Sequence, residues 1–180
     1  MPLPKQHTCT SKDYWNLPDG QRAELIDGQL YNMAPPSRMH QRLVMELSAT
    51  IRDYIRSHHG SCQVYPAPFA VNLGADDKDW VEPDISVICD KNKLTDRGCE
   101  GAPDLVIEVV SPSSNRMDYI IKLNLYMAAG VREYWIVDPL RQRTIVYHLE
   151  SGDAPTIFAF SQPISVGIFP SLTICIADLL

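Results

Sequence analysis

Two carboxylates stand inside apolar runs, where a negative charge is costly to bury unless a cation lies beside it. Glu108 lies within residues 105–110, which are otherwise apolar on both faces, as is typical of a central strand covered on each side. Asp84 opens a second apolar strand, PDISVI, after Glu82 and Pro83. If both strands belong to one sheet, their carboxylates can reach one hard divalent cation such as Mg²⁺, which prefers oxygen ligands.

Each of these carboxylates also has a purely structural interpretation. Glu108 could form a buried ion pair with a lysine or arginine, and Asp84 could be a turn aspartate after Pro83. Asp104 also follows a proline, and strand alternation places it on the same face as Glu108. We interpret Asp104 as a strand-start residue or as a partner of a metal ligand. The metal interpretation is favoured because two such strands occur together.

Lys122 is a third candidate, in a helix that follows the Glu108 strand. Its position at the flank of the apolar stripe allows two interpretations. In the first, it forms a solvated i,i+4 ion pair with Asp118. In the second, its ammonium stabilises charge developing on a phosphate or orients the attacking water.

Glu24 and His40 complete the candidate set. Glu24 opens an edge strand, where a glutamate is ordinarily a surface residue. His40 falls in the middle of the apolar face of a helix, where a histidine is more often a satisfied core residue than a catalyst. The residues alone therefore do not assign a function to either one.

The elements that must position these residues follow from hydrophobic periodicity. A short helix is expected at 13–17, and Asp27-Gly28 predicts a hairpin turn within AELIDGQLYNM. The clearest helix is expected at about 38–58, between a Ser37 N-cap and Gly60. The later elements are expected strands at 62–73, 83–89 and 102–111, a helix at about 115–129 capped by Ser113 or Ser114, a strand in VREYWIVDP, and strands at 143–149 and 155–160. The strand–helix–strand order predicts a parallel crossover, and hence an α/β fold as one domain over 1–180.

Four arginines form a stripe on the helix at 38–58. Arg38, Arg42, Arg52 and Arg56 fall within an arc of roughly 80°, opposite to His40. A solvated helix face is the first interpretation, and phosphate steering or a subunit contact is the alternative.

Composition excludes several classes of protein. The chain has 180 residues, 45% of them hydrophobic, and its 16 Lys plus Arg against 22 Asp plus Glu give a formal charge of −6, which disfavours indiscriminate duplex binding. A site of carboxylates that hold divalent cations is nevertheless acidic and can handle phosphate. Five scattered cysteines without a C-x-x-C pair predict reduced thiols in a cytoplasm and no thiolate zinc site. We expect neither secretion nor a membrane span.

At these residues the sequence resembles the Uma-two family, a bacterial group of restriction-endonuclease-like proteins in the PD-(D/E)xK nuclease superfamily. The resemblance covers about residues 13–150 and runs in order through AELIDGQLYNMAPPSRMHQRLV, EPDISVI, GAPDLVIEVVSPSS and IKLNLYMAAGVREYWIVDP. It implies a central mixed β-sheet flanked by helices. Asp84 and Glu108 match the motif carboxylates, whereas Val110 occupies the position of the usual lysine. In this family a lysine of the following helix, here Lys122, is taken to substitute.

The resemblance implies metal-dependent hydrolysis of phosphodiester bonds in nucleic acid, with DNA as the expected polymer. Asp84 and Glu108 would hold Mg²⁺ or Mn²⁺, and Lys122 would neutralise charge in the transition state. Glu24 would complete the metal shell through a water, and His40 would orient a carboxylate or contact phosphate. The small size and a two-stranded substrate favour a homodimer. Two alternatives stay open: a catalytically weak or inactive module of this fold that binds nucleic acid or a protein partner, and a hydrolase of some other phosphoester.

Overall fold

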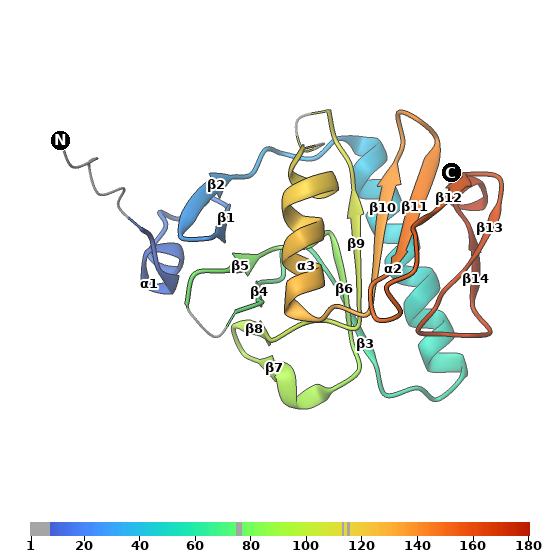
Figure 1. Cartoon of the computed structure of the whole chain (residues 1–180), viewed down its shortest axis with the longest axis horizontal. Coiled ribbons are helices and arrows are strands. Elements are labelled where there is room, and N and C mark those ends of the chain that lie inside the picture. Colours follow the sequence, from blue (N-terminus) through green and yellow to red (C-terminus); the bar gives the residue numbers. More distant parts are fainter. Residues whose placement is uncertain (1–7, 75–76, 113, 115) are drawn as a thin grey trace.

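The computed structural model describes residues 8–74, 77–112, 114 and 116–180, and these residues form two six-stranded sheets and a small two-stranded one (Figure 1). The first sheet has the order β2 (Gln29–Asn32), β1 (Ala23–Ile26), β5 (Trp80–Val81), β4 (Val71–Asn72), β8 (Gly98–Glu100) and β7 (Leu94–Thr95). The second has the order β12 (Thr156–Ala159), β11 (Arg143–His148), β10 (Glu133–Asp138), β9 (Leu105–Val109), β6 (Ile85–Ile88) and β3 (Gln63–Pro66). The small sheet pairs β13 (Pro163–Ser165) with β14 (Thr173–Cys175).

The second sheet is mixed, as the family resemblance implies. Strands β9 and β10 are parallel, and the segment between them supplies the predicted helical crossover. The other neighbours in this sheet pair antiparallel, including β6 with β9. Because β9 is covered on both faces, all five of its residues are buried.

Two helices cover opposite faces of this mixed sheet: α2 (Arg38–Ser57) lies behind it and α3 (Leu123–Ala129) in front (Figure 1). The α2 helix begins as predicted, because the Ser37 side chain accepts a hydrogen bond from the His40 backbone N–H. Its apolar stripe is buried against the sheet. The side chains of that stripe are Leu43, Val44, Leu47, Ile51 and Ile55.

Short helices complete the described elements. They are α1 (Ser11–Trp15), the 3₁₀ turns η1 (Lys91–Lys93) and η3 (Ile176–Leu179), and the π-helical segment η2 (Met117–Lys122), which runs directly into α3. Within the part of the chain that the structure describes, no helix is both long and apolar enough to cross a membrane.

The predicted hairpin between β1 and β2 is confirmed. Asp27 and Gly28 have φ of 48° and 70°, the left-handed values that this tight turn requires at both central positions.

Two predicted elements are divided in the structure. The expected strand at 62–73 is two strands in different sheets, β3 and β4, because Pro66 and Pro68 lack the N–H groups that a continuous ladder needs. The helix expected at 115–129 is the π-helical η2 followed by α3, and the predicted Ser113 cap lies outside the described residues.

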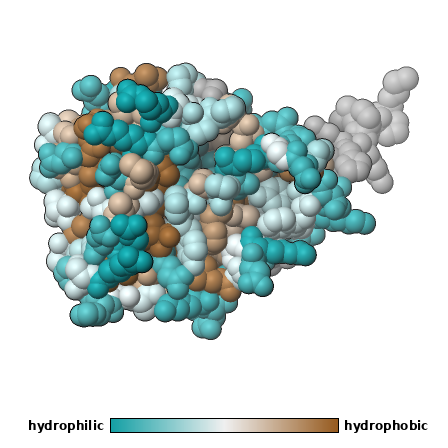
Figure 2. Space-filling model, turned by 180° about the vertical axis from the view of Figure 1, so that it is seen from behind, coloured by the Kyte–Doolittle hydropathy of each residue, from teal (hydrophilic) through white to brown (hydrophobic). Residues whose placement is uncertain are grey.

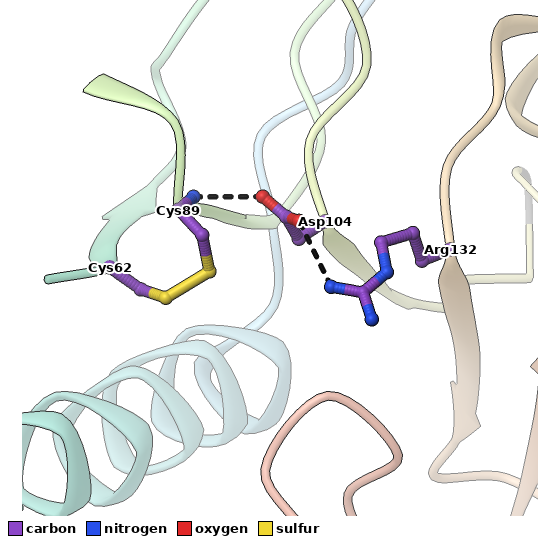
Figure 3. The surroundings of a disulfide bond; sticks show 4 residues. All are labelled: Cys62, Cys89, Asp104 and Arg132. Atoms are coloured by element: carbon purple, nitrogen blue, oxygen red, sulfur yellow. Dashed lines mark hydrogen bonds and ion pairs between the residues drawn. A yellow bond between two sulfur atoms is a disulfide. The ribbon is translucent and has the colours of Figure 1, made fainter. Parts of the chain in front are cut away.

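The expectation that every cysteine is a reduced thiol is wrong for one pair. Cys62 and Cys89 form a disulfide (Figure 3). Cys9, Cys99 and Cys175 are free. Gln63 pairs with Ile88 in the β3–β6 ladder, so the two cysteines stand opposite each other one residue further along, with their Cα atoms 3.9 Å apart. Their separation of 27 residues conceals this proximity, which only the strand pairing creates.

Candidate active site

The structure brings Asp84 and Glu108 together at one end of the β6–β9 pair. The last ladder contact joins Ile85 to Ile107, so the two carboxylates follow one position beyond it. The Asp84 backbone N–H donates to Glu108 Oε2 at 3.4 Å, and the Val109 backbone N–H donates to Asp84 Oδ2 at 2.8 Å. Antiparallel pairing therefore places the start of one strand beside the end of the other.

Lys122 reaches this pair of carboxylates from the helical segment η2. Its Nζ lies 2.9 Å from Glu108 Oε1, 2.8 Å from Glu24 Oε1 and 3.8 Å from Asp118 Oδ1. Only 4% of Lys122 is exposed, so the interpretation as a solvated i,i+4 pair is wrong. Single π-helical turns inside α-helices are frequent at functional sites, and here such a turn contains both Asp118 and Lys122.

Tyr126 is a site residue that the sequence reasoning missed. Its hydroxyl donates to Glu108 Oε1 at 2.7 Å, on the same oxygen that Lys122 contacts, and the tyrosine is completely buried. Asp118, considered only as a solvated partner, is also buried in the site. Asp118, Lys122 and Tyr126 recur every four residues, which is the spacing that places side chains on one helix face and could have revealed all three.

His40 enters the site from the first turn of α2. Its Nε2 lies 3.0 Å from Asp84 Oδ2, and its Nδ1 is buried with no hydrogen-bond partner among the described residues. The inward direction predicted from helix periodicity therefore leads to the candidate metal ligand on the neighbouring strand.

Glu24 is buried, contrary to the expectation of a surface residue on an edge strand. Strand β1 lies between β2 and β5, and Glu24 is 4% exposed. Its Oε1 accepts from the Glu82 backbone N–H at 3.0 Å in addition to its contact with Lys122. The Glu82 carboxylate, which sequence reasoning left unassigned, accepts hydrogen bonds from Arg22 and Tyr14.

Electrostatics at the site are dominated by an excess of buried carboxylates. Burial raises the pKa of Glu108 well above its usual value, with the Lys122 ammonium opposing the rise and Asp84 adding to it. Burial also raises the pKa of Asp118 to about 6, again opposed by Lys122. Burial would lower the pKa of Lys122, but Glu108, Glu24 and Asp118 outweigh it and hold that pKa well above its usual value. One charged lysine among several carboxylates makes additional positive charge favourable here.

These residues line a cleft of about 750 Å³. Its walls include Glu24, His40, Asp84, Glu108, Asp118 and Lys122. Among the described residues, no group of three or more histidine, cysteine, aspartate or glutamate side chains is arranged to hold a metal ion. The two strand carboxylates nevertheless supply the oxygen donors that a hard divalent cation takes, usually one or two carboxylates with waters and phosphate.

Two sequence candidates lie away from this cleft. Asp104 is at the opposite end of β9, where it accepts from the Cys89 backbone N–H and contacts Arg132 (Figure 3). It is thus a strand-start residue and does not touch the candidate ligands. The four arginines of α2 are exposed, as their helical positions predict.

Comparisons with known proteins agree with this architecture. A protein from Synechocystis sp. described as uncharacterized is 26% identical over 156 residues, covering 84% of this chain and 79% of the relative. The crystal structure of a "putative nuclease belonging to DUF820" from Anabaena variabilis superposes with a TM-score of 0.79 at 22% identity, covering 94% of this chain and 96% of that one. That similarity shows a common restriction-endonuclease-like fold. The family model Uma2, described as "Putative restriction endonuclease", matches residues 11–177, and the chain belongs to this family.

Proposed function

We propose that this protein is a metal-dependent endonuclease that hydrolyses phosphodiester bonds in nucleic acid, with DNA as the polymer. One observation carries the proposal: Asp84 and Glu108 adjoin on neighbouring strands of a cleft, with the ammonium of Lys122 2.9 Å from Glu108. Family membership supports the class of reaction.

Asp84 and Glu108 are the residues that would hold Mg²⁺ or Mn²⁺. The excess of carboxylates around them fits a divalent cation, since the site contains more negative than positive side chains. When bound, such an ion supplies polarisation of the phosphate and a coordinated water of lowered pKa.

Lys122 supplies the positive charge that the usual motif places in the strand, where this chain has Val110. Its ammonium lies among Glu24, Glu108 and Asp118, which fix it beside the candidate ligands. In this position it stabilises negative charge that develops on the phosphate as the attacking oxygen approaches. The carboxylates around it keep the amine protonated.

Three other side chains position these groups. Tyr126 donates to Glu108 and so orients its carboxylate, and His40 does the same for Asp84. Glu24 would contribute to the metal shell through a water, since its Oε1 already contacts Lys122.

The test is a cleavage assay on supercoiled plasmid, circular single-stranded DNA and RNA, each with Mn²⁺, Mg²⁺ or EDTA. We expect metal-dependent cutting of DNA that disappears in Asp84→Ala. Cutting of RNA instead would correct the polymer, and cutting that persists in EDTA would reject the metal requirement.

A second candidate, a non-catalytic module of the same fold, has one observation in its favour. Both Lys122 and Tyr126 already contact Oε1 of Glu108, so its charge is compensated without a metal ion. Calorimetric titration with Mn²⁺ separates the two candidates. No cutting together with no ion bound would favour the module.

A further inference from the structure

The α2 helix connects the candidate active site to an exposed basic surface. His40, in the first turn, contacts Asp84, and the helix then extends about 26 Å away from that contact, to Ser57. The face turned to solvent carries four of the sixteen basic residues of an acidic chain. These are Arg38, Arg42, Arg52 and Arg56, named here the arginine face.

The arginine face is poorly neutralised by its own protein. Among the described residues, Arg38, Arg42 and Arg56 form no ion pair, and Arg52 pairs only with its exposed neighbour Asp53 at 2.8 Å. Exposed guanidinium groups without acidic partners are available to bind phosphate, often through two parallel hydrogen bonds.

A groove of about 400 Å³ runs between α2 and β3 beside the arginine face. Gln41 and Ala67 line both this groove and the candidate active-site cleft, so the two lie side by side. Its lining holds Arg52 and the 60%-exposed Met45, and it contains no carboxylate.

Helix geometry separates the acidic residues of α2 from this groove. At roughly 100° per residue, Gln41 and Ser48 lie on one side of the arginine face, and Met45 lies within it. Glu46 and Asp53 lie on its other side. Figure 2 shows the molecule from behind, the side on which α2 lies, with hydrophilic side chains spread among smaller hydrophobic areas.

We infer that the arginine face and its groove bind the phosphate backbone of the nucleic acid whose scissile phosphate lies at Asp84 and Glu108. This inference rests on the proposed function and adds a binding surface to it. The pairs Arg38/Arg42 and Arg52/Arg56 are fourteen positions apart, about 21 Å along the helix, which corresponds to about six phosphates of one duplex strand. Local positive charge thereby lets a protein of net charge −6 hold a polyanion.

The first test is the salt dependence of binding to a fluorescein-labelled DNA oligonucleotide, single-stranded and duplex, by anisotropy in EDTA. Arg38→Gln/Arg42→Gln and Arg52→Gln/Arg56→Gln should each weaken binding about tenfold and reduce the slope of log K against log[KCl] by about 1.4 for single strands or 1.8 for duplex. The control Lys12→Gln/Lys91→Gln removes the same charge from other exposed positions and should leave the slope unchanged.

The outcomes of this binding test separate the possible partners. Equal affinity and slope in the wild type and both arginine variants would overturn the inference. Arginine-dependent binding of poly-glutamate in place of the oligonucleotide would also overturn it, since the surface would then serve an acidic protein.

The second test separates this inference from the proposed function. Bis(p-nitrophenyl) phosphate is a diester too small to reach from the cleft to Arg52 and Arg56. In Arg52→Gln/Arg56→Gln, kcat/KM for plasmid should fall about tenfold more than kcat/KM for this small diester. Equal losses on both substrates would reject the surface while leaving the nuclease intact. Absence of turnover by the wild type on both would reject the nuclease, and the binding test would still decide the surface.

Discussion

The molecule contains two Pro-Asp pairs that begin neighbouring antiparallel strands, and only one of them lies in the candidate site. Asp84 directly precedes β6 and accepts the backbone N–H of Val109, beyond the end of the β6–β9 ladder. Asp104 directly precedes β9 and accepts the backbone N–H of Cys89, just after β6. Both bonds measure 2.8 Å, so each aspartate ties its strand to the neighbouring one in the same way.

The surroundings of the two aspartates differ. Beside Asp84 stand the buried Glu108 and, from α2, His40. Beside Asp104 stand a disulfide and Arg132, whose side chain is 46% exposed (Figure 3). Both aspartates thus cap a strand in the same way. The candidate chemistry at the Asp84 end comes from the adjoining Glu108 carboxylate and from the buried Lys122 ammonium that contacts it.

The largest expected difference between the two ends is in catalysis. Asp84→Ala and Glu108→Ala each remove a candidate metal ligand, so kcat/KM on plasmid should fall at least about 100-fold. Asp104→Ala removes the equivalent strand-capping bond at the other end and should change kcat/KM only through stability. Circular dichroism melts should show all three variants folded at the assay temperature. Similar losses of kcat/KM in Asp84→Ala and Asp104→Ala would mean that activity depends on the strand-capping hydrogen bond of Asp84 and not on its role as a metal ligand.

Local signals in the sequence predicted most of the strands, helices and turns that surround these two aspartates. The Asp27-Gly28 turn, the capped helix α2 and the apolar β9 each depend on neighbours within a few residues. The division of 62–73, the π-helical turn and the Cys62–Cys89 bond could not be predicted, because tertiary packing decides them.

Part of the candidate site could also be predicted from local sequence signals. Glu108 could be singled out because the charge of a carboxylate in an apolar strand must be compensated by a cation. In the structure this cation is Lys122. The burial of Glu24 depends on its strand pairing with β5, a partner distant in sequence. Glu24 and His40 were therefore recognised through family resemblance.

The second prediction concerns stability at the two ends. Lys122→Met leaves Glu24 and Glu108 buried without their cation, so the free energy of unfolding should fall by about 3–5 kcal/mol. Arg132→Met breaks the exposed contacts with Asp104 and Glu150 and should cost less than about 1 kcal/mol. Urea denaturation of both variants measures the difference. Equal losses of unfolding free energy in the two variants would show that the buried ion pairs of Lys122 stabilise the fold no more than the exposed ion pairs of Arg132.

The third prediction concerns the disulfide at the Asp104 end. Cys62→Ser/Cys89→Ser opens a loop that spans 27 residues, and loop-closure entropy gives an expected loss of about 3–4 kcal/mol in the free energy of unfolding. Thermal melts with and without dithiothreitol check this, with the serine variant as the reduced reference. Mass spectrometry after alkylation in denaturant without reductant should find three alkylated cysteines in the wild type, because the buried Cys99 then becomes accessible. Five alkylated cysteines would show that the bond is absent from the purified protein.

The fourth prediction concerns pH at the active-site end. Burial raises the pKa of Asp118 from 3.8 to about 6, so the folded protein prefers the neutral carboxyl. Below pH 3.8 the aspartate is protonated in both the folded and the unfolded state, and its contribution is zero. As pH rises toward 6 the unfolded chain loses this proton first, so stability falls, by about 3 kcal/mol in total once pH exceeds 6.

Asp118→Asn removes this titration. In EDTA, the variant should therefore unfold at a higher temperature than the wild type at pH 8, and the two should converge near pH 4. Asp19→Asn, at an exposed position, should differ from the wild type by less than about 0.5 kcal/mol and serves as the control. A lower melting temperature for Asp118→Asn at pH 8 would mean that the attraction between Asp118 and Lys122 across 3.8 Å outweighs the burial of the charge. The aspartate would then stabilise the buried lysine, as an acidic partner does at the Asp104 end for Arg132.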